Sequence, residues 1–470
     1  MEVINDSLSI RNGRLFIEDC DAAELAQNFG TPLFVVSETH LRNNLRRYKA
    51  AFESCWPEGN VCIMPAFKAN PITAVRKILS DEGCGCDIFG ASELEGALRG
   101  GVPAKDISVN GSIKDRATIR RAIEVGARIV LDSPNELEIC QQEAKALNKP
   151  ARVMFRLKPF MENLTLKSDF APDFEIRELT QLIKYGVPTS ELLPMGPRAM
   201  ELSHIEPIGI HVHMGRHSKQ LEVWQAWVYH CVMLTKELSD LMGGWSPKHI
   251  DFGGGFPSFP DTDTDVMIKR YEGPELEEYA QVITDTLRDT MNLVGLSCKG
   301  VVIEVEPGRG LHCDTGIHLT TVKNTKFEQM NRPRRWAELD TSEVFLGIPG
   351  LNEEPPFDYI FANKCDLENE IETDLVGQTC NAELLFNQVK APTLESGDVI
   401  ALLNTGAYTE PMAANFNALP RPGTLLVCGS EADMIKRHET INEVYSRDEL
   451  PIRVLDRLDN KREVGHSQIA

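Results

Sequence analysis

The sequence predicts an α/β barrel of eight strand–helix units together with a β-rich domain. Two observations support this fold class. Between residue 37 and about residue 310, short apolar runs alternate with amphipathic helical patterns, and their number and regularity favour a TIM-like barrel over an open doubly wound sheet. After residue 310 the helical patterns stop, and short strand patterns follow with turn residues between them.

The composition narrows the possible function classes. The chain has 470 residues and a net charge of −21, with acidic residues spread along it, which argues against nucleic acid as a partner. It has no signal-like start and no apolar run long enough to cross a membrane, so we expect a soluble, cytoplasmic protein that does not bind membranes. The twelve cysteines lack the spacing of a metal site or a disulfide framework, and we predict reduced thiols and no metal.

The first 36 residues carry strand patterns that precede the barrel. Three apolar runs, at 8–10, 15–17 and 33–36, flank one predicted helix at 21–28. We expect these strands to join the β-rich domain. The predicted division is therefore a cofactor-binding barrel at residues 37–310 and a β-rich domain made of residues 1–36 and 311–470.

Eight strand candidates define the barrel in chain order. They are 61–68, 86–89, 107–110, 128–132, 152–158, 207–214, 249–252 and 301–306. Helical patterns separate most of them, at 91–99, 115–124, 134–147 and 221–242. A further helix is predicted at 38–55, where Ser37 is a suitable N-cap because its hydroxyl can accept a hydrogen bond from a backbone N–H of the first turn.

Two parts of the chain are less regular. Residues 188–197 contain several prolines and are predicted to form a loop or an insertion. Beyond residue 310 we expect short strands at 318–322, 336–339, 344–346, 399–403 and 425–427.

Polar residues end all eight predicted barrel strands, which is where barrels of this type carry their chemistry. These residues are Lys68, Asp87, Asn110, Asp132, Arg156, His213, Asp251 and Glu306. Lys68 is the most informative of them, because it ends the apolar run 61–67. It is either a lysine that reaches solvent or pairs with an acid, or a lysine whose pKa is lowered by burial so that its amine forms a Schiff base.

Three further stretches bear on this hypothesis. The run Gly253-Gly254-Gly255 offers backbone N–H groups to an anion, although a tight turn after a strand is the plainer explanation. Glu306 and Arg309 either pair with each other or bind, respectively, a protonated ring nitrogen and a phosphate. His211 and His213 share one strand face without a third metal ligand at a recognisable spacing. One histidine is therefore predicted to stack on an aromatic ligand, and His211 is equally well explained as a core residue.

Taken together, these groups describe one ligand, pyridoxal 5′-phosphate. They comprise an amine for an aldehyde, a cradle for a phosphate, a carboxylate for a ring nitrogen and a flat stacking partner. The carboxylate matters because it keeps the pyridine nitrogen protonated, so that the ring can accept the electron pair left at Cα.

The order of the motifs resembles that of the fold-type III decarboxylases, which include diaminopimelate, ornithine and arginine decarboxylases, and it is most similar to the diaminopimelate branch. The resemblance runs from about Thr31 to about Val427. Its motifs are Phe67-Lys68-Ala69-Asn70, His213 with Gly215, Gly253 to Pro257, Glu306 to Arg309, Gly397-Asp398, Gly406-Ala407-Tyr408, Phe416-Asn417 and Pro420-Arg421-Pro422.

The resemblance implies a decarboxylase that acts on an amino acid, assembled as a homodimer with active sites shared between subunits at the barrel mouth. The implied catalytic residues are Lys68 as the Schiff-base lysine, His213 stacked on the ring and Cys380, which returns a proton to the substrate in the partner subunit. The implied cofactor-binding residues are Lys68, Asp87, Arg156, His213, Gly254, Gly255, Glu306, Gly308, Arg309 and Tyr408.

The chain departs from the family pattern at positions that the family uses to recognise its ligands. Arg216 and His217 precede Ser218, whereas the family usually has serine directly after the glycine. The acids that follow the family's cysteine are displaced here, so that Glu383, with Tyr408, is the predicted substrate-binding residue. Residues 340–343 lack a following arginine, and Phe416 replaces a common tyrosine. We therefore expect an amino acid, or an amino-acid-derived intermediate, other than meso-diaminopimelate.

Two other functions fit the same motifs. A racemase or an eliminase would use the same cofactor, with Cys380 or His217 exchanging the Cα proton. A non-catalytic regulatory paralogue is suggested by Arg216 and Asn381, but the intact Lys68, Glu306 and Arg309 argue against it.

Overall fold

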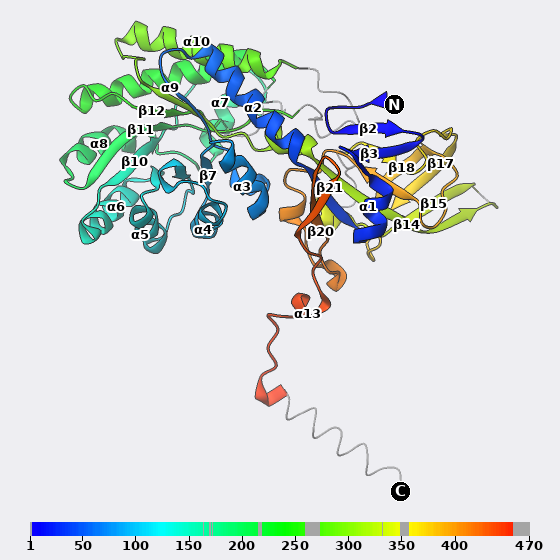
Figure 1. Cartoon of the computed structure of the whole chain (residues 1–470). Helices are drawn as coiled ribbons and strands as arrows, with labels where there is room; N and C mark the ends of the chain where they lie inside the picture. Colours follow the sequence, from blue (N-terminus) through cyan, green and yellow to red (C-terminus); the bar gives the residue numbers. More distant parts are fainter. Residues whose placement is uncertain are drawn as a thin grey trace.

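The computed structural model describes residues 2–162, 164–168, 171, 173–214, 219–258, 273–330, 332–347 and 357–454. A barrel surrounded by helices lies beside a β-rich region that combines the N-terminal strands with the chain beyond residue 316 (Figure 1). Among the helices within these ranges, none combines the length and the apolarity that crossing a bilayer requires.

Eight parallel strands form the barrel in the order β6-β13-β12-β11-β10-β9-β8-β7. Their bounds are β6 Val61–Ile63, β7 Cys86–Ile88, β8 Ile107–Val109, β9 Arg128–Leu131, β10 Ala151–Arg156, β11 Ile205–His211, β12 His249–Asp251 and β13 Val302–Val305. The two ends of the sheet meet, because Gly85 N donates a hydrogen bond to Ile63 O at 2.9 Å and Ala66 forms a bridge with Asp87. The predicted barrel is confirmed, because each of the eight observed strands overlaps its predicted range.

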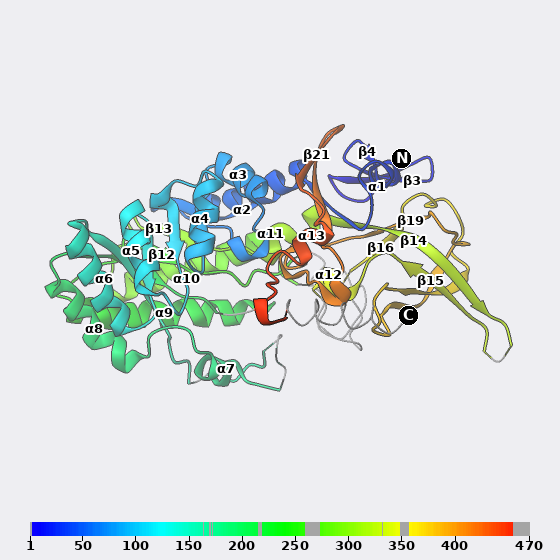
Figure 2. The ribbon, with the colours of Figure 1, turned by 90° about the horizontal axis from the view of Figure 1, so that it is seen from below.

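Helices cover the outside of the barrel (Figures 1 and 2). They are α2 Glu38–Cys55, α3 Thr73–Asp81, α4 Ala91–Arg99, α5 Arg116–Val125, α6 Pro134–Leu147, α7 Ile176–Leu182, α8 Thr189–Glu201, α9 Leu221–Leu241 and α10 Leu276–Val294. As expected, Ser37 caps α2, and its side chain accepts a hydrogen bond from His40 N.

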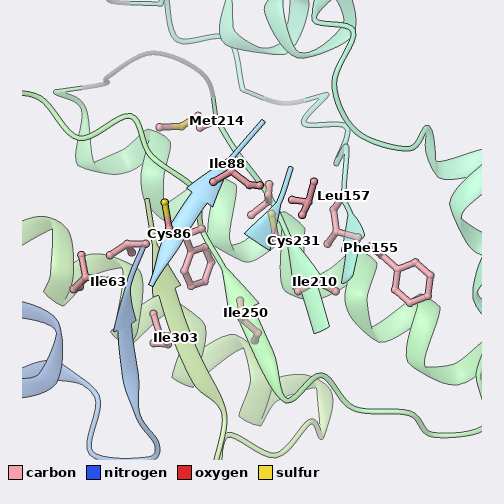
Figure 3. Packing of buried hydrophobic residues seen from close by; sticks show 14 of the residues in the cluster. Ile63, Cys86, Ile88, Phe155, Leu157, Ile210, Met214, Cys231, Ile250 and Ile303 are labelled. Carbon is pink, nitrogen blue, oxygen red and sulfur yellow. The ribbon is translucent and has the colours of Figure 1, made fainter. Parts of the chain in front are cut away.

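Buried isoleucines from neighbouring strands pack together in the barrel (Figure 3). Ile63, Ile303, Ile250 and Ile210 come from β6, β13, β12 and β11, which are adjacent in the sheet. Parallel strands of this kind are covered on both faces, which explains why they appear in the sequence as short apolar runs.

Three predicted elements were wrong. The first barrel strand ends at Ile63, and Lys68 lies on a 3₁₀ turn, η1 (Phe67–Ala69), because Pro65 cannot donate a ladder hydrogen bond. The proline-containing stretch at 188–197 lies in the helix α8, whose Gly196 packs against Leu238 of α9. Tertiary packing of a buried face outweighs the poor helix propensity of proline there.

The predicted strand at 344–346 is the third error. These residues form the short helix α12 (Glu343–Leu346), because the Ser342 side chain accepts a hydrogen bond from Val344 N and starts a helical turn.

The β-rich region consists of a four-stranded sheet and a nine-stranded sheet. The first contains β1 Glu2–Val3, β2 Leu8–Arg11, β3 Arg14–Ile17 and β4 Cys20–Asp21, which precede α1 Ala22–Phe29. The second contains β5 Leu33–Ser37, β14 Gly316–Glu328, β15 Arg334–Leu339, β16 Tyr359–Phe361, β17 Ile371–Val376, β18 Leu384–Ala391, β19 Val399–Leu402, β20 Gly423–Cys428 and β21 Glu431–Lys436. Strand β5 lies between β14 and β20. The exact division at residues 36/37 and 310/311 stays a prediction.

Candidate active site

Lys68 lies at the C-terminal end of the barrel beside Asp87. Its Nζ is 3.4 Å from Asp87 Oδ2, and 48% of its side chain is exposed. The Asp87 carboxylate raises the pKa of Lys68. The nearby Tyr408 and Glu306 raise it further, whereas partial burial lowers it. The expectation of a lowered pKa was therefore wrong, because a carboxylate that stabilises the ammonium form outweighs desolvation.

Asn110 connects Asp87 to Glu306. Its Nδ2 donates to Asp87 Oδ1 at 2.8 Å and to Glu306 Oε1, while its Oδ1 accepts a 2.8 Å hydrogen bond from Ser108 Oγ. Asp87 lies in β7, Asn110 directly follows β8 and Glu306 directly follows β13, and these strands all end at the same rim of the barrel. The lysine, the amide and the two carboxyl groups thus form one continuous polar chain at the barrel mouth.

Glu306 is a buried carboxyl group without a lysine or arginine bonded to it among the described residues. Burial and, after it, the Asp87 charge raise the pKa of Glu306 to about 8, against the charges of Lys68 and Arg156, which lower it. A group with such a pKa is poised to exchange a proton with a basic ring nitrogen placed beside it.

His211 and Asp251 complete the buried cluster around Glu306. His211 Nε2 lies 3.2 Å from Glu306 Oε1, and burial keeps the pKa of His211 well below its ordinary value. Asp251 accepts a 2.8 Å hydrogen bond from Gly253 N, and burial and the Glu306 charge raise its pKa well above the ordinary value.

This cluster bears on the prediction of no metal site. In the described part of the chain, one group of three side chains offers metal-type ligand atoms within 4.8 Å of one another, and it is His211, Asp251 and Glu306. The sequence search missed this group because its members lie on three separate strands. Asn110 and His211 contact Glu306, and Gly253 N donates to Asp251 Oδ1, whereas His211 Nδ1 and Asp251 Oδ2 have no hydrogen-bond partner among the described residues. The absence of a metal stays a prediction.

Two of the predicted phosphate-binding glycines leave no room for a side chain. A Cβ at Gly254 would lie 2.5 Å from Glu306 O, and one at Gly308 would lie 2.5 Å from the Tyr408 hydroxyl. Tyr408 reaches this place from the β-rich region, and its backbone N donates to Ala69 O at 3.0 Å, next to Lys68. The Arg309 guanidinium lies 5.2 Å from the centre of the Tyr408 ring. An arginine, a phenol and the backbone N–H groups of a glycine run suit a phosphate.

His213 and Arg156 flank the same rim. His213 lies against the glycine turn, because a Cβ at Gly253 would be 2.9 Å from His213 Cβ. Burial lowers the pKa of His213 well below its ordinary value, and the charges of Lys68 and Arg156 lower it further. Arg156 donates to Asn110 O at 3.0 Å and lies 4.7 Å from the centre of the Tyr185 ring. A neutral imidazole and a nearby guanidinium fit a flat, anionic ligand.

Cys380 and Glu383, two further predicted residues of the β-rich region, lie on the loop between β17 and β18. Cys380 is exposed, and its backbone N donates to Asn417 Oδ1 at 3.0 Å. Glu383 is buried, and its Oε1 accepts hydrogen bonds from Ser342 Oγ at 2.6 Å and from Thr379 Oγ1. The substrate-binding role of Glu383 stays a prediction, and its contacts are with its own chain. Gly215, Arg216, His217 and Ser218 lie outside the described residues.

Sequence reasoning missed the connecting residues. Asn110 and Asp251 were noted at strand ends, but no role followed from that position alone, and His211 was equally explained as core. The available signal was their shared place at the carboxyl ends of parallel strands, which brings distant residues to one rim.

Comparison with known proteins gives this geometry a context. The chain is 29% identical to the diaminopimelate decarboxylase of Methanocaldococcus jannaschii, with 96% of this chain and 98% of the relative covered. It is also 29% identical to the diaminopimelate decarboxylase of Pseudomonas aeruginosa, with 95% and 99% covered. The crystal structure of the M. jannaschii enzyme superposes with a TM-score of 0.83 at 27% identity and covers 96% of this chain and 99% of that chain.

A family model described as pyridoxal-dependent decarboxylase, pyridoxal binding domain, matches residues 38–312. The matched segment contains the whole barrel, Lys68, the buried carboxyl cluster and the glycine cradle. These residues fit the cofactor, because two glycine positions exclude a side chain and a buried carboxyl group with a raised pKa lies beside the amine. Pyridoxal phosphate is therefore the cofactor, and decarboxylation of an amino acid is the reaction. The chain belongs to the family of pyridoxal-dependent decarboxylases.

Proposed function

We propose that the residues of the barrel mouth divide the work of decarboxylation among them. The observation that carries this assignment is the polar chain Lys68–Asp87–Asn110–Glu306, which ends beside the cradle at Gly254 and Gly308. When bound, the cofactor supplies an electron sink for the pair left at Cα as the carboxylate departs.

The proposed roles follow from each side chain's chemistry. Lys68 binds the aldehyde carbon of pyridoxal phosphate through its Nζ, and Asp87 holds that Nζ in place. Glu306 shares a proton with the ring nitrogen, while Asn110 and His211 fix its carboxyl group. His213 packs on the ring face, Arg156 lies beside it, and the phosphate is held by Gly254, Gly255, Gly308, Arg309 and Tyr408. Cys380 returns a proton to the substrate, and Tyr408 binds the substrate.

We further propose a homodimer in which each subunit completes the other's active site. Cys380 is exposed in the single subunit, and the segment that contacts it through Asn417 carries two exposed apolar side chains, Met412 and Phe416. The chain beyond β21 leaves the body of the subunit (Figure 1) and carries Ile441, Tyr445, Leu450 and Ile452, all exposed. Exposed apolar surface of this kind is typical of a face that a second subunit covers.

The substrate is proposed to be an amino acid of the size that diaminopimelate decarboxylases handle. One related crystal structure, 26% identical with a TM-score of 0.83, is the M. jannaschii enzyme in co-complex with L-lysine. The names of these relatives give no support to the prediction that meso-diaminopimelate is not the substrate, so meso-diaminopimelate heads the list of compounds to test. A cytoplasmic location is also proposed, and it is supported by twelve cysteines that are all free thiols.

The test of these roles starts with Lys68→Ala. We expect this variant to release no carbon dioxide from any amino acid and to lack the absorbance near 400 nm that borohydride abolishes in the wild type, with the reduced adduct mapped to Lys68. Lys105→Ala, at a largely exposed lysine paired with Asp106, is the control and should behave like the wild type. Turnover retained by Lys68→Ala would overturn the assignment, and racemised substrate without gas release would indicate a different reaction.

A further inference from the structure

A buried arginine contacts the turn that carries Lys68. Arg76 belongs to α3, and its side chain is completely buried. Within the described ranges no carboxylate pairs with it, and neither its Nε nor its Nη2 has a hydrogen-bond partner. A charge that is buried without a counter-charge is costly, so stability does not account for the presence of an arginine at this place.

Two contacts connect Arg76 to the segment around Lys68. Its Nη1 donates a hydrogen bond to Pro65 O at 3.1 Å, and its guanidinium carbon lies 5.4 Å from the centre of the Phe67 ring. Pro65 lies where the chain leaves β6, and Phe67 directly precedes Lys68 on η1. The guanidinium therefore holds the backbone that leads into the lysine at two points.

The helix α4 keeps the arginine and the ring in place. An added Cβ at Gly100 would lie 2.4 Å from Arg76 Cγ, and one at Gly96 would lie 2.3 Å from Phe67 Cζ. Because neither glycine has room for a side chain, Arg76 and Phe67 both pack directly on the backbone of α4. This packing restricts movement of the guanidinium relative to the ring.

Arg76 and Asp87 act on different parts of the lysine. The Asp87 carboxylate contacts the amine, with Oδ2 3.4 Å from Nζ, whereas Arg76 contacts the backbone segment from which the side chain starts. A lysine side chain is a flexible four-carbon stem. The place of its backbone therefore decides how readily the amine reaches a reacting carbon.

We propose that Arg76 is a positioning residue for Lys68, which it serves by holding Pro65 and Phe67 so that the amine is directed at the cofactor aldehyde. This inference rests on the proposed function, in which Lys68 binds that aldehyde. Arg76 touches neither cofactor nor substrate and acts through the turn alone.

The test separates binding of the cofactor from bond formation with Lys68. Pyridoxal phosphate carries the aldehyde, whereas pyridoxamine phosphate carries an amine in its place and cannot react with the lysine. In Arg76→Met, we expect the pyridoxal phosphate concentration that gives half of the absorbance near 400 nm to rise about tenfold. Binding of pyridoxamine phosphate, followed by protein fluorescence, should change less than about twofold, because its phosphate and ring contacts remain.

Thermal unfolding of the cofactor-free variants is a second measurement. Arg76→Met should unfold no more than about 3 °C below the wild type, because the variant loses an unpaired buried charge. Arg99→Met makes the same change at an exposed arginine of α4, and this control should match the wild type in all three measurements. Arg76→Lys keeps the charge but not the planar group, and it should show a selective loss of about threefold for pyridoxal phosphate. It decides the question if Arg76→Met does not fold.

Two results would overturn the inference. One is a folded variant in which both cofactor forms bind equally less tightly, which would make Arg76 a structural residue only. The other is unchanged binding of pyridoxal phosphate. A wild type that gains no borohydride-sensitive absorbance with pyridoxal phosphate would instead refute the proposed function itself.

Discussion

Glu306 illustrates how position alone changes the chemistry of a side chain. The same residue on the surface would be ionised at neutral pH, but here burial and Asp87 raise its pKa to about 8. Asn110 and His211 both contact its Oε1, which fixes the direction in which the carboxyl group faces. In the proposed function, the proton that Glu306 holds is the one that it shares with the ring nitrogen of the cofactor.

This pKa predicts a pH dependence of stability for the cofactor-free protein. Between about pH 4.5 and pH 8 the folded state keeps a proton that the unfolded state releases, so stability falls as the pH rises through this window. Glu306→Gln cannot release a proton. The free energy of unfolding of the wild type should therefore fall relative to this variant, by on the order of 1 kcal/mol per pH unit.

Thermal unfolding of both proteins at pH 5.5 and pH 8 measures this change. Glu338→Gln is the control, because Lys326 lowers the pKa of Glu338 and no proton is released from it in this range. An unchanged difference between wild type and Glu306→Gln at the two pH values would mean that Glu306 is ionised throughout.

The single residues of the site differ in how far the sequence could reveal them. Lys68 and Glu306 could be identified because each ends an apolar run, and the run Gly253-Gly254-Gly255 is evident in the sequence itself. The role of Asn110 could not be predicted, because its hydrogen bonds join β8 to β7 and β13, and the order of strands around a barrel fixes those contacts. The direction of the Lys68 pKa shift also depends on the distance to Asp87, which no sequence pattern specifies.

At the scale of elements, a buried ion cluster joins three barrel strands. Arg128 of β9 donates to Glu304 of β13 at 2.5 Å, and His249 of β12 lies 2.7 Å from the same oxygen. Arg128 and Glu304 are both almost completely buried. The cluster lies among side chains that are otherwise mostly apolar, so each charge depends on the others.

Breaking this cluster on one side should be costly. Arg128→Met removes the guanidinium and leaves the buried Glu304 carboxylate with His249 as its remaining partner in the cluster, and we expect a loss of about 3–5 kcal/mol in the free energy of unfolding. The double variant Arg128→Met/Glu304→Leu removes both charges and should recover most of that loss. Urea unfolding of the two variants and the wild type decides the point, and a double variant no more stable than the single one would contradict it.

The elements themselves were largely predictable, and the errors have physical causes. Strand and helix periodicity identified the barrel, since its strands are buried on both faces. The helix α8 was missed because Pro194 and Pro197 lie inside it, and only its packing against α9 reveals why it forms. Strands β16, β17, β18 and β21 were missed because pairing partners far along the chain, rather than local pattern, define them.

At the scale of the whole molecule, the proposed homodimer makes a sharp prediction. Lys68→Ala and Cys380→Ala subunits should each be inactive alone, because one lacks the amine and the other the proton donor. If each site takes Lys68 from one subunit and Cys380 from the other, mixing and re-associating equal amounts should restore about one quarter of the wild-type activity.

Carbon dioxide release after re-association at equal concentrations provides the measurement. Each variant carried alone through the same procedure is the control. A mixture as inactive as its components would show that Lys68 and Cys380 serve one site within a single subunit or none.

The placement of β5 has a consequence for how the chain is made. This strand leaves the ribosome early, yet it pairs with residues 316–319 on one side and residues 423–427 on the other. The barrel can therefore be completed before β14 and β20 have paired with β5. Until then the apolar side chains of β5 are exposed to solvent. Long-range pairing of this kind slows folding and exposes a strand edge meanwhile. A chain that stops before residue 423 would leave that edge of β5 permanently without its β20 partner, open to pairing with other chains.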